Sequence, residues 1–266
     1  MIYPMIDIHC HILPGIDDGP ESIGEALEMC RAAASDGIKT IVATPHFRPG
    51  SNEFTGPKIL EAAGTLQSAV MNDGIDIRIL PGAEVAVSPE MPSYLTARKH
   101  LTINHNGRYF LTEFSSLSVP PNWDNFLLSF LVSGLVPIIA HPERNAWFAA
   151  HPDALSHVVE RGVMVQITAM SVTGHLGPEA RDFSVHLLKR GLVHMIASDG
   201  HSSDSRPPVL SGAMDLVSDL LGEERARAMV TSVPEAVIEG RDVPVFAAPA
   251  YAPPKRGIRR WFGRRA

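Results

Sequence analysis

The sequence predicts an α/β fold in which seven parallel strands and the helices between them close into a (β/α)7 barrel. The chain has 266 residues, which is near the roughly 250 residues of a single α/β barrel. Seven short apolar segments alternate with helix-like stretches, a pattern typical of a parallel sheet. Neither Gly-x-Gly-x-x-Gly nor Gly-x-x-x-x-Gly-Lys-[Ser/Thr] occurs, which makes a nucleotide-binding open sheet the weaker alternative.

The predicted strands are short β-rich runs. They cover residues 5–11, 40–46, 77–85, 109–114, 136–141, 163–169 and 193–199. Helices are predicted between them, and Gly37 after the first helix is a typical helix stop. The helices cover residues 22–35, 57–72, 123–133, 152–161, 178–190 and 209–221, with a short one within 89–98.

The charge of the chain is unevenly distributed. The net charge is −6, but the last twelve residues carry six basic residues and no acidic one, so residues 1–254 carry −12. Such an acidic body repels phosphate backbones, so no nucleic-acid partner is expected. We expect one domain over residues 1–241 and a Pro-rich linker with a basic tail over residues 242–266.

The composition also indicates a compartment. The chain has only two cysteines, Cys10 and Cys30, which excludes a disulfide framework. No apolar run approaches the roughly 20 residues of a membrane span, and the amino terminus has no basic region or apolar core of a secretory signal. We therefore expect a cytoplasmic protein.

Histidine, glutamate or aspartate residues lie at the ends of six of the seven predicted strands. His9 and His11 share one face of the first strand, and Cys10 points away from it, because successive strand side chains alternate. The carboxyl ends of parallel barrel strands meet at one mouth, so these side chains should converge there. The converging set is His9, His11, His46, Glu84, Glu113, His141, Asp199 and His201.

This set contains more ligands than one metal ion needs. Mixed nitrogen and oxygen donors suit zinc, manganese or iron, and shared carboxylates suit ions about 3.5–4 Å apart. The loop after the first strand, with Asp17 and Asp18, offers one more carboxylate. A lone histidine is usually structural, but this placement at six strand ends favours a metal site. Such ions lower the pKa of bound water to about 7 and neutralise charge on a phosphoryl group.

Two arginines follow this set in the sequence. Arg144 comes three residues after His141, and Arg206 lies in a proline-stiffened loop after His201. A guanidinium binds phosphate oxygens bidentately, which favours a phosphate-binding role over a surface ion pair. A cysteine phosphatase loop would need arginine six residues after its cysteine, where this chain has Ile16 and Asp36. A Gly-x-Ser-x-Gly serine elbow is absent.

The motifs that carry this set resemble those of the polymerase and histidinol phosphatase (PHP) family. They are Asp7-x-His9-x-His11, Thr44-Pro45-His46, Glu84, Glu113, His141 and Asp199-x-His201. Within that family the chain is most similar to the CpsB/YwqE/CapC-type bacterial tyrosine-protein phosphatases of capsule and exopolysaccharide synthesis. One departure is Thr168, where relatives commonly have asparagine.

The resemblance implies a distorted TIM-like barrel and three divalent metal ions, often manganese, with iron, zinc, magnesium or cobalt as alternatives. It implies one ion held by His9, His11, Glu84 and Asp199, a second by Glu84, Glu113 and His141, and a third by Asp18, His46 and His201. Asp18 is chosen over Asp17 only by the resemblance. Arg144 and Arg206 match the phosphate-binding positions, and Asp199 or His201 could supply a proton.

The function expected on these grounds is hydrolysis of protein phosphotyrosine, with the tyrosine-rich tail of a bacterial tyrosine kinase as substrate. Two alternatives stay open: a small-molecule phosphatase such as histidinol phosphatase, and a regulatory binding module that holds metals without turnover. The basic tail is either a peripheral anchor on the inner membrane face or a disordered end. The sequence leaves the oligomeric state open, a homo-oligomer included.

Overall fold

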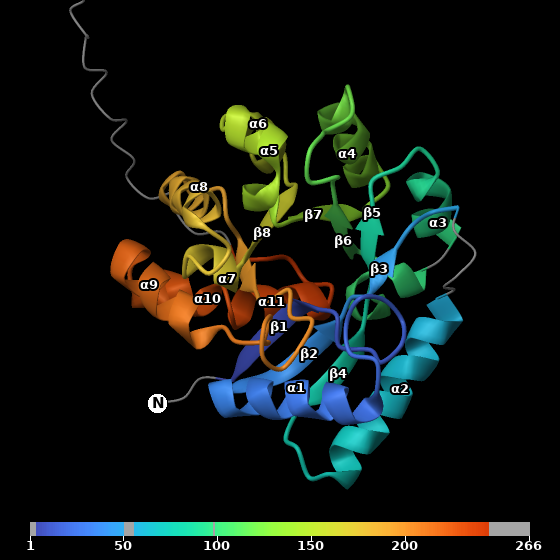
Figure 1. Cartoon of the computed structure of the whole chain (residues 1–266). Coiled ribbons are helices and arrows are strands. Elements are labelled where there is room, and N and C mark those ends of the chain that lie inside the picture. The colour runs from blue at the N-terminus through green and yellow to red at the C-terminus, as the bar shows by residue number, and fades with distance from the viewer. Residues whose placement is uncertain (1–3, 51–55, 98, 245–266) are drawn as a thin grey trace, which may run out of the picture.

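The computed structural model describes residues 4–50, 56–97 and 99–244, so most of the predicted basic tail lies outside the described residues. All strand pairs are parallel, as predicted, and they form two sheets (Figure 1). The first sheet has the order β1 (Met5–Cys10), β2 (Ile38–Ala43), β4 (Arg78–Pro81). The second has the order β3 (His46–Phe47), β5 (Glu84–Ala86), β6 (Tyr109–Glu113), β7 (Val136–Ala140), β8 (Met164–Thr168), β9 (Met195–Ala197).

The α/β class is confirmed, but the described strands number nine in two sheets and not seven in one closed sheet. The difference arises because the predicted strands 40–46 and 77–85 are each broken in two. The first breaks at Thr44-Pro45, since proline cannot donate a ladder hydrogen bond. The second breaks at Gly82, where a Cβ atom would lie 2.9 Å from the Val42 side chain.

Hydrogen bonds also connect β1 with the end of β9, across the gap between the two sheets. Cys10 and Gly200 form an isolated parallel bridge. The Asp199 amide donates to the His9 carbonyl at 2.8 Å, and the His11 amide donates to the Gly200 carbonyl at 2.8 Å. The first and last strands therefore meet at the level of the predicted metal ligands.

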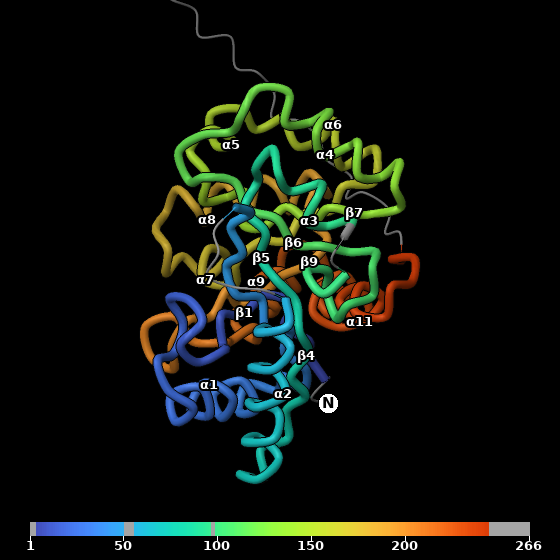
Figure 2. Tube along the Cα trace, turned by 90° about the vertical axis from the view of Figure 1, so that its right-hand side faces the viewer, coloured from blue at the N-terminus to red at the C-terminus, as the bar shows by residue number. Residues whose placement is uncertain are grey.

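Helices cover the outside of the sheets. The predicted first helix is observed as α1 (Ile23–Asp36), capped by the Ser22 side chain and ended by Gly37 with φ 96°. In both views α1 and α2 lie along the first sheet, and α4 to α6 lie at the opposite end of the molecule (Figures 1 and 2). The other predicted helices are observed as α2 (Gly56–Asn72), α3 (Met91–Ala97), α4 (Trp123–Val132), α6 (Ala154–Val159), α8 (Pro178–Lys189) and α9 (Ser211–Leu221).

Sequence analysis missed the short helices. Most follow a strand or another helix within a few residues, so they are too brief to show a 3.6-residue period. They are α5 (Ala146–Ala150), α7 (Ala169–Val172), α10 (Glu223–Ala228), α11 (Ser232–Ile238) and the 3₁₀ turns Lys99–Leu101, Ile103–His105 and Pro142–Arg144.

Two apolar clusters form the core. The larger one joins the helices to the sheets. The smaller one takes side chains from both sheets, so the sheets enclose a common interior below the functional residues. It includes Ile8, Val42, Leu80, Leu111, Ile138, Met164, Met195 and Ala197.

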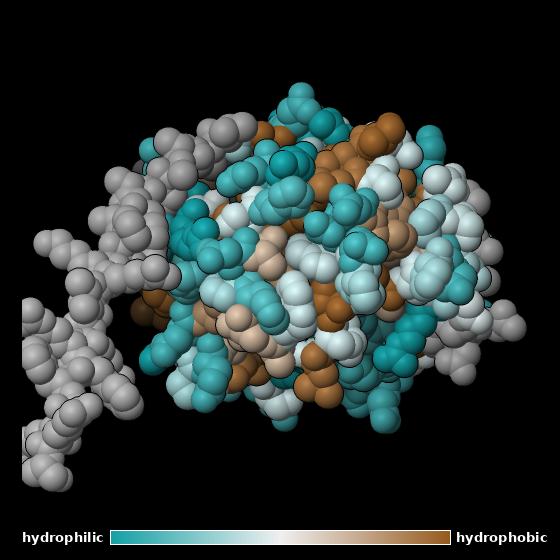
Figure 3. Space-filling view, turned by 90° about the horizontal axis from the view of Figure 1, so that it is seen from above, coloured by the Kyte–Doolittle hydropathy of each residue, from teal (hydrophilic) through white to brown (hydrophobic). Residues whose placement is uncertain are grey.

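Large apolar side chains are sparse on the described surface. Leu117, in the turn before α4, is 79% exposed, and Val132, at the end of α4, is 91% exposed. On the face seen from above, brown apolar areas are interrupted by teal polar ones (Figure 3). No helix among the described residues is long and apolar enough to cross a membrane.

Two glycine substitutions with opposite expected effects on the free energy of unfolding test the helix assignments. Gly37→Ala should lower the free energy of unfolding by about 1–2 kcal/mol, because Gly37 holds a left-handed φ. Gly64→Ala should raise it by up to about 1 kcal/mol, because Gly64 lies inside α2 with open space around it. Urea unfolding measures both, and a change of the same sign in both variants would contradict the assignment.

Candidate metal centre

The structure brings all the predicted site residues together at the carboxyl ends of the strands. His9 is the next-to-last residue of β1, Glu113 ends β6, and His141 follows β7. His46 and Glu84 differ from the prediction, because they begin the short strands β3 and β5. His46 and Glu84 are partners in the parallel pairing of β3 with β5, which sets them side by side in the cluster.

The fully buried carboxylate of Glu84 lies at the centre of the cluster. Its Oε1 atom is 2.8 Å from His141 Nε2 and 3.4 Å from His9 Nε2. Its Oε2 atom is 2.9 Å from Nδ1 of His46 and 3.5 Å from Nε2 of His11. Burial opposes the charged form, but the imidazoles outweigh it and hold the pKa of Glu84 well below its ordinary value.

His9 and His11 direct the same ring nitrogen toward the centre. The Nδ1 atom of His9 is 2.9 Å from Gln166 Oε1, and the Nδ1 atom of His11 is 2.6 Å from Asp17 Oδ2. Both partners are acceptors, so each Nδ1 carries the hydrogen and each Nε2 presents a lone pair. The two Nε2 atoms are nevertheless only 3.1 Å apart. Two lone pairs at this distance repel each other, so a proton shared by the two nitrogens or a metal ion has to lie between them.

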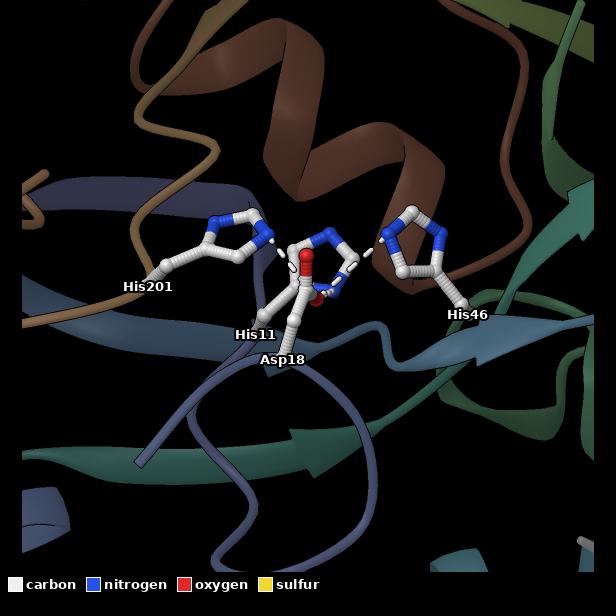
Figure 4. A group of neighbouring side chains, drawn as sticks. All are labelled: His11, Asp18, His46 and His201. Carbon is white, nitrogen blue, oxygen red and sulfur yellow. Dashed lines mark ion pairs between the residues drawn. The ribbon is translucent and has the colours of Figure 1, made fainter. Parts of the chain in front are cut away.

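Asp17 and Asp18 have different positions. Asp17 binds His11 and also accepts the His46 amide at 2.9 Å. Asp18 instead places Oδ1 3.5 Å from His46 Nε2 and 3.3 Å from His201 Nε2 (Figure 4). Only Asp18 therefore lies between two imidazoles, which agrees with the choice that the resemblance made.

Two buried atoms in the cluster lack a hydrogen bond although they are close together. His46 Nδ1 and Glu84 Oε2 are 2.9 Å apart, and neither has a hydrogen-bond partner of acceptable geometry. His46 Nδ1 also lies 3.1 Å from Glu113 Oε1. Atoms that surround a common point without bonding to one another fit ligands of an ion.

The pKa values of His46 and His11 also show that the cluster favours positive charge. Burial disfavours the imidazolium of His46, but Glu113 and Glu84 outweigh it and raise the pKa of His46 to about 11. Burial is likewise outweighed at His11, where Asp17 and Glu84 raise the pKa to about 9. Divalent ions bound here would supply the positive charge that these carboxylates attract.

The donor atoms form four overlapping groups in the described residues, with all atoms of a group within 4.8 Å of one another. Because the groups share members, the cluster offers more donors than a single ion needs. The groups are His11, Asp18, His46 and His201; His9, His11 and Glu84; His9, His141 and Asp199; and His46, Glu84 and Glu113. The distribution of ligands among three ions that the resemblance implies stays a prediction.

Both predicted arginines reach the same carboxylate oxygen. Arg144 Nη1 and Arg206 Nη2 donate to Asp199 Oδ2, the second at 2.7 Å, and Arg206 also donates to the Asp199 carbonyl at 3.0 Å. Burial opposes the charge on Asp199, but His9, His141 and Arg144 outweigh it and keep its pKa below the ordinary range. Asp199 and His141 have φ values of 51° and 32°, a strained backbone that aims both side chains inward.

Sequence analysis assigned no role to three buried polar residues around the cluster, although one of them, Asp7, stands in the first motif. Gln166 orients His9, as described above. Asp7 accepts from the Ser198 amide at 2.9 Å and the Ser198 hydroxyl at 2.5 Å, and burial raises the pKa of Asp7 to about 6. Glu143 accepts from the Thr168 amide and the Ser171 hydroxyl. A polar residue inside an apolar strand, as at Asp7 and Gln166, is the signal that could have revealed two of them.

Comparison with known proteins finds relatives that match most of the length of this chain. Tyrosine-protein phosphatase YwqE of Bacillus subtilis (strain 168) is 36% identical over 259 residues, which is 97% of this chain and 99% of YwqE. Tyrosine-protein phosphatase CpsB of Streptococcus pneumoniae is 30% identical over 239 residues, which is 88% of this chain and 98% of CpsB.

A solved structure of these relatives has a similar fold. A chain from the crystal structures of B. subtilis YwqE and S. pneumoniae CpsB, described as unique metal-dependent tyrosine phosphatases, superposes with a TM-score of 0.85 at 35% identity. The match covers 90% of this chain and 96% of that one. The model of the family described as "Capsular polysaccharide synthesis, CpsB/CapC" matches residues 5–239. The chain therefore belongs to the CpsB/CapC family.

Proposed function

We propose that this protein is a metal-dependent phosphatase that hydrolyses phosphotyrosine in a protein substrate. The observation that carries the proposal is the convergence of Arg144 and Arg206 on one oxygen of Asp199, at the edge of a buried histidine and carboxylate cluster. Guanidinium groups held beside a metal centre suit a dianionic phosphoryl group. The names of the relatives YwqE and CpsB support the same activity.

The proposed ligands are the nine clustered residues, and we propose three ions, with manganese as the first choice. Bound divalent ions lower the pKa of coordinated water to about 7 and neutralise charge on the phosphoryl group. The ligands are His9, His11, Asp18, His46, Glu84, Glu113, His141, Asp199 and His201.

The arginines hold the phosphoryl oxygens in this proposal. Both guanidiniums are paired with Asp199, so their donors face the proposed reaction site. Tyrosinate, the leaving group, has a pKa of about 10 and needs little protonation to depart. Asp199 and His201 both have a pKa below the ordinary value. A group with a lowered pKa is a weak base and is unprotonated near neutral pH, so the role of Asp199 or His201 as the source of a proton stays a prediction.

We further propose that the two sheets are arcs of one distorted seven-stranded barrel of the PHP type. In this view β2 continues into β3 and β4 into β5 as bent strands, which returns the strand count to seven. The Cys10–Gly200 bridge supports closure between the last strand and the first. Both sheets also contribute to one interior cluster.

The proposed setting is the cytoplasm, with a bacterial tyrosine kinase of capsule synthesis as partner and its tyrosine-rich tail as substrate. The family description, capsular polysaccharide synthesis, supports this setting. We propose that residues 1–241 form the phosphatase domain and that residues 242–266 form a linker and tail that contacts the inner membrane face. Association into a homo-oligomer is compatible with the proposal.

Removal and return of metal test the activity. Chelator-stripped protein should release no phosphate from a phosphotyrosine peptide, and manganese should restore release. Arg144→Ala and Arg206→Ala should each lower kcat/KM by about 100-fold, because a donor to the phosphoryl charge is lost. The control Arg181→Ala removes an exposed arginine of α8 paired with Asp182 and should have no effect. A higher kcat/KM for histidinol phosphate than for the peptide would contradict the proposed substrate.

Gln166 tests the metal site independently of turnover. Gln166→Ala removes the acceptor that orients His9, so manganese affinity measured by calorimetry should fall about 10- to 100-fold. Gln166→Glu keeps an acceptor at this position and should retain most of the affinity. Equal losses of manganese affinity in both variants would show that the hydrogen bond between His9 and Gln166 does not determine the affinity.

The tail is tested with vesicles. Residues 255–266 contain six basic residues together with Trp261 and Phe262, and each basic residue contributes about 1 kcal/mol on an anionic surface. The full chain should co-sediment with anionic vesicles, and a chain ending at residue 254 should not. Neutral vesicles serve as the control. Unchanged sedimentation of the shortened chain would rule out the anchor.

A further inference from the structure

Two cavities open on different sides of the metal centre. The first, which we call the aryl cavity, has a volume of about 600 Å³ and includes His46, Glu113, His141 and Arg144 in its wall. The second, the acidic groove, has a volume of about 540 Å³ and includes Asp18, His201 and Arg206. A substrate whose phosphoryl group lies at the centre could extend into either one, and both volumes suit a small ligand.

Charge separates the two cavities. The aryl cavity is lined by two cations, Arg48 and Arg144, and by the single carboxylate of Glu113. The acidic groove is lined by Arg206 and four carboxylates, namely Asp18, Glu25, Glu28 and Asp204. A dianionic phosphate ester is attracted to the first wall and repelled by the second.

The wall of the aryl cavity also suits a flat apolar group. Ala86, Val87 and Phe114 stand in it, and the fully buried Phe148 lies behind Phe114. Phe114 and Phe148 pack edge to face, with ring centroids 5.5 Å apart and planes at 78°. The Val87 amide donates to the Glu113 carbonyl at 2.9 Å, which fixes Val87 beside the proposed ligand Glu113. Aromatic rings gain most from such rigid apolar walls.

We propose that the aromatic ring of the substrate lies in the aryl cavity, along Val87 and Phe114, and that the acidic groove stays free of the ester. This inference rests on the proposed function and deepens it, because it predicts selection for aryl over alkyl phosphate esters. A serine or threonine phosphate places no ring against this wall. The loss of that contact should cost roughly 10- to 100-fold in affinity.

The test fills each cavity in turn and measures binding without turnover. Metal-loaded protein is titrated in a calorimeter with phenylphosphonate, which carries a ring, and with inorganic phosphate, which does not. Val87→Phe should weaken phenylphosphonate binding at least 10-fold and leave phosphate binding within about 2-fold. Glu28→Phe, the matched control, adds the same ring to the acidic groove and should change neither affinity.

Ala86→Leu is a second, smaller filling of the aryl cavity and should show the same selective effect if Val87→Phe does not fold. The inference is overturned if a filled aryl cavity weakens both probes equally, or if Glu28→Phe is the variant that weakens phenylphosphonate. Absence of phosphate release from a phosphotyrosine peptide, with selective loss of phenylphosphonate binding in Val87→Phe, would overturn the proposed function and keep the ring site.

Discussion

The negative charge of Glu84 is buried among imidazoles. The arrangement of the histidine and carboxylate cluster depends on neutralising this charge. An isolated carboxylate out of water is costly, so it persists only where positive charge surrounds it. His9, His46 and His141 each lie within 3.4 Å of its oxygens. Most of the remaining structure can be understood as the means of holding these rings around one carboxylate.

The backbone achieves this by irregularity at the strand ends. Alternation along residues 40–46 and 77–85 places His46 on the face of Val42 and Glu84 on the face of Leu80, which is the face of the smaller core cluster. The breaks at Thr44-Pro45 and Gly82 interrupt the strands just before these two residues. The positive φ values of His141 and Asp199 have the same effect on the other side of the mouth. Local strain is thus concentrated where the functional groups converge.

Asp199 lies between the histidine cluster and the two arginines. Its Oδ1 atom is 3.5 Å from the Nε2 atoms of His9 and His11, while its Oδ2 atom accepts from Arg144 and Arg206. One residue therefore faces both the proposed metal ligands and the proposed phosphate-binding groups. The two cavities diverge from this point, one with mainly cationic and apolar walls and the other with acidic walls.

The sequence by itself determined the α/β class, the parallel direction of the strands and the convergence of the ligand set. These follow from local periodicity and from the rule that parallel strands end on one side, so spacing alone assigns His9 and His11 to one face of the first strand. Tertiary structure alone decided the partners that orient them. Gln166 is 157 residues from His9 in sequence, and neither this contact nor the separate positions of Asp17 and Asp18 follow from spacing. Such contacts depend on how whole strands and loops pack, because a periodic pattern specifies the face of a residue but not which atom lies opposite it.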